Sequence, residues 1–225
     1  MFTLPLFPTT KWAKIRMYGI LLVFVYVIID IFCIPLYWSI RYKPQVGDFI
    51  FESLVPAELV RAIEGATHSE FSHVGVVKQK NDGSWVVVEA MNGVEETPLW
   101  RYIAKSRWDH FAVYRLRPEY RGFIPTFMKE IEKYHGRPYD YRYAMDDAYI
   151  YCSELPYKAF KSASGRELGE LKTLGQLNWK PYESTIRKLD GGSLPLDRVM
   201  ITPVDLSKAP ELELILNVGY PNLHP

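Results

Sequence analysis

Two runs of β-branched residues in the middle of the chain constrain its fold more than any other feature. "HVGVVKQ" begins at His73, "WVVVEAM" begins at Trp85, and "KNDGS" lies between them. Valine-rich runs favour strands, and Asn-Asp-Gly is typical of the turn in a hairpin. The pattern predicts two antiparallel strands joined by a short turn.

Shorter elements surround this predicted hairpin. Further strands are predicted at "DFIFE", at "HFAVYRLR" and near "DRVMITP"; helices are predicted at "PAELVRAIEGA", around "LWRYIAK", at "IPTFMKEIEKYHG" and over "SELPYKAFKSA". The strand and helix patterns together indicate an α+β domain in which helices pack to one side of an antiparallel sheet.

The N-terminal part of the chain is strongly apolar. Residues 17–40 read "MYGILLVFVYVIIDIFCIPLYWSI", with Asp30 as the one charge, which is long enough at helical rise to cross a bilayer. The bulky "CIPLYW" end differs from a signal-peptide cleavage site. We therefore expect a membrane anchor over 1–43 with a transmembrane helix at about 17–40, then a soluble domain over 44–225. A buried core helix is the alternative. The expected location is single-pass membrane, with the domain outside the cytoplasm.

Charge and cysteine content exclude some classes of function. The chain has 27 basic and 26 acidic residues, a net charge of +1, so nucleic acid is not an expected partner. Its two cysteines are Cys33, in the apolar segment, and Cys152, so a disulfide framework is not expected.

Cys152 is the strongest candidate for a reactive residue. Pro156 fits a helix only in its first turn, so a helix over "SELPYKAFKSA" begins near Cys152 or Ser153. A thiol at the positive end of a helix is stabilised as thiolate, the attacking form. The alternative is an ordinary buried cysteine, which packs as a small apolar group.

His73 is the best candidate for a base, because it opens a predicted strand and has Ser72 and Gly75 nearby, which let another group approach closely. A turn of three or five residues would put Glu89 on the same face of the hairpin as His73. A nucleophile, a base and an orienting acid would then be available. A structural, hydrogen-bonded histidine is the alternative interpretation of His73.

Other candidate sites are weaker. Tyr139 and Tyr141 in "RPYDYRY" are candidates for lining a substrate pocket, or for packing residues. In "HSEFSH" the two histidines lack the spacing of a helical zinc pair, so no metal is expected. The chain has no phosphate-cradling glycine loop, and no cofactor is expected.

Several motifs resemble one known family. "VGDFIF", "HSEFSHVGVV", "WVVVEAM", "GRPYDY" and "YCSELPYKAF" resemble the permuted papain-like hydrolases of the YiiX/YebB type, relatives of the NlpC-type cell-wall peptidases; the match runs from about Val46 to Phe160. The resemblance implies a circularly permuted papain-like (NlpC-type) fold. It also implies Cys152 as nucleophile, His73 as base and Glu89 as the orienting acid.

The expected function is that of a membrane-anchored cysteine amidase or peptidase. It would act through a Cys-His-Glu triad and a thioester acyl-enzyme on a peptide, a cell-wall stem peptide or an N-acyl or lipid amide. A lipid-directed thiol acyltransferase or lipase is the first alternative, because the same chemistry can pass an acyl group to another acceptor. A noncatalytic binding module on the same fold is the second alternative.

Overall fold

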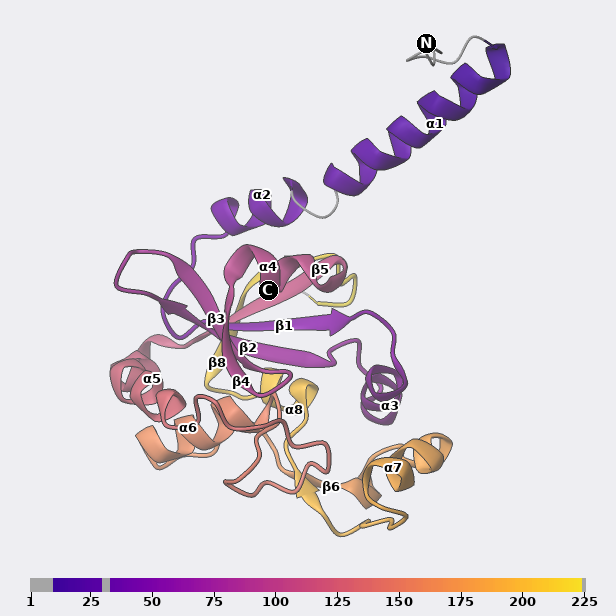
Figure 1. Cartoon of the computed structure of the whole chain (residues 1–225). Helices are drawn as coiled ribbons and strands as arrows, with labels where there is room; N and C mark the ends of the chain where they lie inside the picture. Colours follow the sequence, from indigo (N-terminus) through magenta and orange to yellow (C-terminus); the bar gives the residue numbers. More distant parts are fainter. Residues whose placement is uncertain (1–9, 30–32, 224–225) are drawn as a thin grey trace.

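The computed structural model describes residues 10–29 and 33–223, and its centre is a six-stranded sheet (Figure 1). The strand order is β4-β3-β2-β1-β5-β8, and every neighbouring pair is antiparallel. The strands are β1 (Phe49–Leu54), β2 (His73–Gln79), β3 (Trp85–Ala90), β4 (Val94–Pro98), β5 (Ser106–Leu116) and β8 (Leu212–Val218). The predicted hairpin is confirmed as β2 and β3, and the α+β class with an antiparallel sheet is confirmed.

Helices and a small second sheet surround the central sheet. The helices of the globular part are α3 (Glu58–Thr67), α4 (Leu99–Ala104), α5 (Ile124–Glu132), α6 (Glu154–Ser164), α7 (Glu183–Leu189) and α8 (Pro203–Ser207), with 3-10 turns η2 (Pro118–Phe123), η3 (Leu174–Gln176) and η4 (Lys180–Tyr182). The second sheet pairs β6 (Lys172–Thr173) with β7 (Val199–Met200). Figure 1 shows α3 and α7 together at one end of the central sheet.

Both faces of the central sheet are buried, whereas the sequence pattern predicted helices on one face. In β2, Val74 and Val76 belong to the larger core, which contains residues of α5 and α6. Val77 belongs to a second core with residues of α4. Successive side chains of a strand point to opposite faces, so a strand that is apolar at both parities needs cover on both sides.

The predicted transmembrane helix is wrong. The apolar segment is divided between α1 (Lys11–Ile28) and α2 (Ile34–Arg41), and residues 30–32, with Asp30, lie outside the described residues. Three basic residues fall inside α1, and Pro35 occupies the first turn of α2, where proline favours a helix start. Among residues 10–29 and 33–223, no helix combines the length and apolarity needed to cross a membrane. The predicted single-pass location, with the domain outside the cytoplasm, depended on that helix and is contradicted with it.

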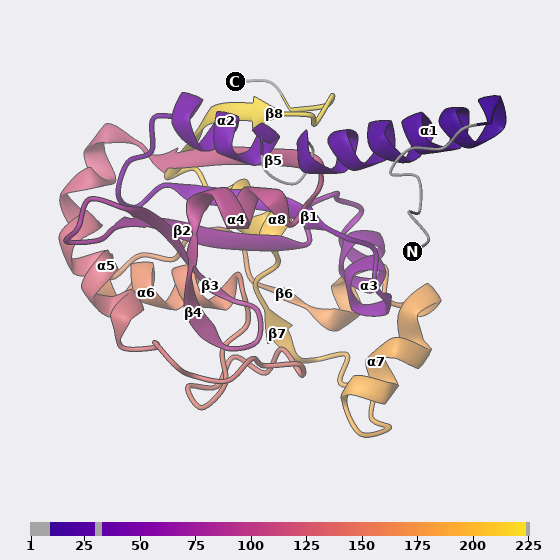
Figure 2. The ribbon, with the colours of Figure 1, turned by 45° about the horizontal axis from the view of Figure 1, so that its top comes forward.

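The second of these helices packs on the globular part. α2 contacts α4, as Figure 2 shows, and Trp38 packs edge-on against Phe111 of β5 with 6.1 Å between ring centroids. Just after α2, the buried Tyr42 hydroxyl donates a hydrogen bond to Asp48. Asp48 also accepts a 2.6 Å hydrogen bond from Nε of Arg115 in β5. The division of the chain into 1–43 and 44–225 stays a prediction.

Candidate active site

Cys152 lies immediately before α6. The helix begins at Glu154, with Ser153 at the N-cap and Pro156 in the first turn, close to the predicted start. The thiol is 2% exposed, and its sulfur lies 4.0 Å from the carbonyl oxygen of Ser72. Cys152 therefore packs against the main chain next to His73, although 80 positions separate it from Ser72.

His73 and Glu89 meet on one face of the hairpin. The register pairs Gly75 with Glu89 and Gln79 with Trp85, which leaves residues 80–84 in the turn and puts both side chains on the same face, as predicted from the turn length. Nε2 of His73 lies 2.5 Å from Oε2 of Glu89, and both residues are buried. The carboxylate thereby fixes the orientation of the ring and leaves Nδ1 as the second ring nitrogen.

Gly75 allows this ring to be covered. A Cβ atom at Gly75 would lie 2.3 Å from a Val87 methyl of β3 and 3.1 Å from the Tyr102 ring, so a larger residue would force the Val87 side chain aside and crowd Tyr102. Tyr102 instead stacks on the His73 imidazole, with 5.8 Å between centroids, and its hydroxyl donates a 2.9 Å hydrogen bond to the carbonyl of Ile50. Gly75, the small residue expected from the sequence to permit a close approach, thus leaves room for Tyr102 beside the His73 ring.

The thiol and the imidazole approach each other from opposite faces of β2. His73 shares the α4 face with Tyr102, whereas Cys152 belongs to the core on the α6 face. The ladder between β2 and β3 starts at Gly75, so Val74 lies beyond its last pair, and the Val74 N–H lowers the pKa of the Cys152 thiol. Among the described residues, no hydrogen bond joins the thiol to the imidazole.

The resting protonation states follow from burial. Burial raises the pKa of Cys152 to about 11, although the N–H groups of Val74 and Ser153 and the Tyr139 hydroxyl oppose the change. Burial likewise lowers the pKa of His73, against the hydrogen bond to Glu89. The site therefore holds a neutral thiol beside a neutral imidazole. The thiolate that the helix terminus suggested is disfavoured, because desolvation outweighs the hydrogen bonds that favour the charged form.

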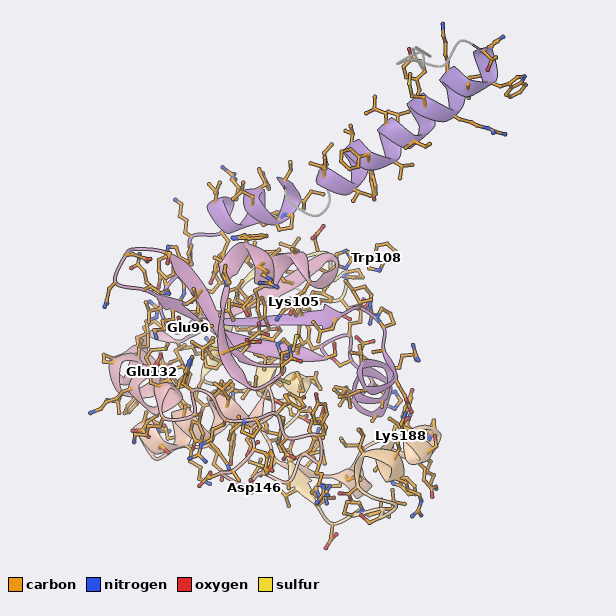
Figure 3. The ribbon with its side chains drawn as sticks, viewed as in Figure 1. Glu96, Lys105, Trp108, Glu132, Asp146 and Lys188 are labelled. Carbon is orange, nitrogen blue, oxygen red and sulfur yellow. The ribbon has the colours of Figure 1, made fainter. Side chains whose placement is uncertain are left out.

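Glu89 is ionised in this site. Burial alone would raise its pKa, but the hydrogen bond from His73 and the ammonium of Lys105 outweigh burial and hold the pKa of Glu89 at about 2. Lys105, at the C-cap of α4, forms an ion pair with Glu89 and lies 3.8 Å from Glu52. Figure 3 shows Lys105 over the central strands. Sequence reasoning missed Lys105 and Glu52, because nothing in "LWRYIAK" indicates which strand residues the helix covers.

A cavity with mostly apolar walls lies beside Cys152 and Ser153. Its walls include Ala62, Ala66, Leu174, Ile186, Met200 and Ile201. Tyr141 and Tyr143 also line it. The Tyr139 ring packs at a tilt against Tyr141, with 4.9 Å between centroids, and the hydroxyls of Tyr139 and Tyr143 lie 3.1 Å apart. Of the two tyrosines considered from the sequence, Tyr141 thus lies at the cavity and Tyr139 lies beside the sulfur.

The fold and this site define a class. A cysteine at the start of a helix, packed on an antiparallel sheet whose adjacent strands carry a histidine and an acid, is the arrangement of papain-like cysteine hydrolases. Here the histidine strand precedes the cysteine helix, which is the permuted order.

Comparisons with known proteins agree. The sequence model of the permuted papain-like amidase enzymes, the YaeF/YiiX or C92 family, matches residues 43–216. YiiX of Escherichia coli K12 is 29% identical over 184 residues, covering 79% of this chain and 88% of YiiX. The crystal structure of yiiX from Escherichia coli O157:H7 superposes with a TM-score of 0.71 at 28% identity, covering 79% of this chain and 99% of that one. The chain belongs to the permuted papain-like amidase family, and it is a cysteine hydrolase of the amidase or peptidase type.

The yiiX protein from Escherichia coli O157:H7 is described as a metalloprotein. In the part of this chain that the structure describes, no three His, Cys, Asp or Glu side chains are grouped as metal ligands would be. These described residues do not fit a bound metal ion.

Proposed function

We propose that the protein hydrolyses amides through Cys152 as nucleophile, His73 as general base and Glu89 as the acid that orients the base. One observation carries this proposal. The buried hydrogen bond of 2.5 Å between His73 and Glu89 lies next to Ser72, whose carbonyl contacts the Cys152 sulfur. The three residues come from three separate segments, and a merely structural histidine would not require a thiol and a carboxylate to meet beside it.

The proposed reaction starts from the neutral pair. Glu89 accepts the hydrogen bond from Nε2–H of His73, so Nδ1 carries the lone pair. The step requires the Cys152 thiol to move from the Ser72 carbonyl to within hydrogen-bond distance of Nδ1. Nδ1 then takes the proton as sulfur bonds to the carbonyl carbon. The C–N bond then breaks, and the amine leaves with the proton from His73. Water, deprotonated by His73, cleaves the thioester and returns the thiol.

Two groups suit stabilisation of the tetrahedral oxyanion. The backbone N–H of Cys152 lies just before α6, and the Tyr139 hydroxyl lies near enough to the sulfur to lower the pKa of the Cys152 thiol, so both could donate to the carbonyl oxygen on which the charge develops. Tyr139 also contacts the hydroxyl of Tyr143 at 3.1 Å, which orients it.

Replacing Tyr139 with Phe tests this role. The variant keeps the ring and removes the donor, so kcat is expected to fall by about 10- to 100-fold while KM changes little. Steady-state kinetics on an N-acyl amide measures the effect. Tyr149→Phe is the control, because Tyr149 lies in the same loop and is exposed. Equal kcat values for the two variants would remove Tyr139 from the mechanism.

The cavity supports an apolar acyl group on the substrate. Its wall next to Cys152 and Ser153 is largely aliphatic, so an apolar chain bound there would place the carbonyl end near the sulfur. We therefore propose an N-acyl amide, or a peptide with an apolar acyl-side residue, as the substrate. The same wall also favours the second candidate, an acyltransferase that passes the acyl group to an amine or alcohol. Hydroxylamine or an added alcohol that captures the acyl group faster than water would indicate transfer.

Filling the cavity tests the acyl proposal. In a series of N-acyl amides, kcat/KM is expected to rise by about fourfold for each buried CH₂ group. Ala66→Phe occupies the cavity and is expected to abolish this gain for longer chains. Ala57→Phe, an exposed position at the start of α3, serves as the matched control. A chain-length dependence that Ala66→Phe leaves intact would place the acyl group elsewhere.

The whole proposal is tested by trapping the acyl-enzyme. The full-length protein is incubated with an N-acyl p-nitroanilide, and its intact mass is measured after rapid acid quenching. An added acyl mass located on Cys152, and lost over time with product release, supports the proposal. Turnover without such an adduct on Cys152, or binding without turnover, would favour the noncatalytic module or another nucleophile.

A further inference from the structure

A second buried carboxyl lies next to His73. The register of β1 and β2 pairs Glu52 directly with His73, while Glu89 is opposite Gly75, so both carboxyls share the face of the imidazole. Glu52 and Glu89 are 0% and 1% exposed. The strand positions alone would allow either residue to orient the base.

The contacts of the two carboxyls differ. Glu89 bonds Nε2 of His73 at 2.5 Å and pairs with the Lys105 ammonium. Glu52 lies 3.8 Å from Lys105, and neither of its side-chain oxygens has a hydrogen-bond partner among the described residues. Lys105 is further held over the Tyr102 ring, 4.3 Å from its centroid. The Lys105 ammonium thus contacts the Glu89 carboxylate directly, whereas it lies near the outer limit of ion-pair distance from Glu52.

We infer that Lys105 is a positioning residue of this site, whose ammonium holds the Glu89 carboxylate against Nε2 of His73 and leaves the Glu52 carboxyl outside the pair. This inference rests on the proposed function, because it assigns Lys105 to the same base. Which of the two carboxyls bonds the imidazole of His73 therefore depends on Lys105, the C-cap residue of α4.

The electrostatics agree with this geometry. Burial raises the pKa of Glu52 well above its usual range, and the charge of Glu89 adds to that effect while Lys105 opposes it. Burial therefore disfavours the charged form of Glu52. The neighbouring Ser53 donates its N–H to the Tyr220 hydroxyl. The titratable and charged groups on the face of His73 are Glu52 of β1, Glu89 of β3, and Tyr102 and Lys105 of the α4 segment. Cys152, before α6, contacts the neighbouring main chain at Ser72.

Removing the cation is expected to raise the pKa of His73. Lys105 lowers that pKa through its charge. Without Lys105 the choice between the carboxyls is lost, but Glu89 or Glu52 still lies beside the ring as an acid partner that raises the pKa. A higher pKa means that the imidazole stays protonated to a higher pH, where it no longer serves as a base. The acidic limb of the kcat/KM profile should therefore move up by about one pH unit, and activity at a fixed pH on that limb should fall about tenfold.

The experiment compares Lys105→Met with Lys105→Arg in the full-length protein. The NMR titration of the His73 imidazole and the pH profile of kcat/KM are both recorded. Lys105→Met should shift both upward by about one pH unit with KM unchanged, and Lys105→Arg should restore the native values, since the guanidinium keeps the charge. A His73 titration that Lys105→Met leaves unmoved would overturn the inference.

A second variant tests the inference without removing the cation. Glu52→Gln removes the second carboxyl and keeps its volume. Because Glu89 is the acid bonded to the ring, the pH profile and the His73 titration should match those of the native protein. If Glu52→Gln shifts them, Glu52 is the acid in use and the inference is wrong, even where Lys105→Met does not fold. The titration of His73 needs no turnover, so a failure of the proposed function, seen as activity that survives in Cys152→Ala, remains distinguishable.

Discussion

Cys152→Ala is expected to lower kcat/KM for amide hydrolysis by about 10⁴-fold or more, because no acyl-enzyme can form without the sulfur. The fold should persist, since Ala fills most of the volume of a small side chain that is already packed in the core. The measurement combines amide hydrolysis rates with the intact mass of the protein after incubation with substrate. Neither product nor acyl adduct should accumulate in the variant.

Cys33→Ala is the matched control for this loss. Cys33 is the second free cysteine of the chain and is exposed, whereas Cys152 is buried. Activity that follows Cys33 instead of Cys152, or that survives in Cys152→Ala, would refute the assignment of the nucleophile. Circular dichroism and thermal unfolding of both variants separate a lost nucleophile from a lost fold.

Glu89→Gln is expected to lower kcat by about 10²- to 10⁴-fold, because the amide keeps the volume but neither fixes the tautomer of His73 nor stabilises the imidazolium that forms. The loss should appear in kcat more than in KM, since Glu89 contacts the base and lies away from the cavity wall. Glu95→Gln is the control, because Glu95 of β4 lies directly opposite Glu89 in the strand register but is exposed. Similar losses in the two variants would contradict the proposed role.

The same substitution has a pH-dependent effect on stability. The pKa of Glu89 is held at about 2, below its unfolded value, so its ionisation stabilises the fold above the unfolded pKa. That contribution, about 3 kcal/mol, is lost as pH falls through the folded pKa. Glu89→Gln should therefore lower the Tm clearly at pH 7 and much less near pH 2. A Tm difference that is independent of pH would show that Glu89 is not the ionised partner of Lys105.

The parts of this fold that were predicted correctly were predicted from short-range sequence patterns. The alternation in "HVGVVKQ" and "WVVVEAM", with five residues between the strands, places His73 and Glu89 on one face of the hairpin. The position of Pro156 locates the start of the cysteine helix to within about two residues. Both results depend on backbone geometry within a few residues, which a sequence encodes directly.

Longer-range properties were misjudged from the same sequence. The apolar run over 17–40 was interpreted as one spanning helix, but the structure divides it into α1 and α2 and packs α2 on α4. Hydropathy reports the average character of a segment and does not reveal which surface a helix finds to pack against. The second buried face of the sheet was missed for the same reason.

The sequence was sufficient to choose the residue types of the candidate site, their order along the chain and the parity of the hairpin, because these are local. The protonation of Cys152, the choice of Glu89 over Glu52 and the placement of Lys105 were decided by the folded chain. Each depends on how much water is excluded and on which charges lie within about 4 Å after packing. Those distances exist only once segments far apart in the sequence have come together.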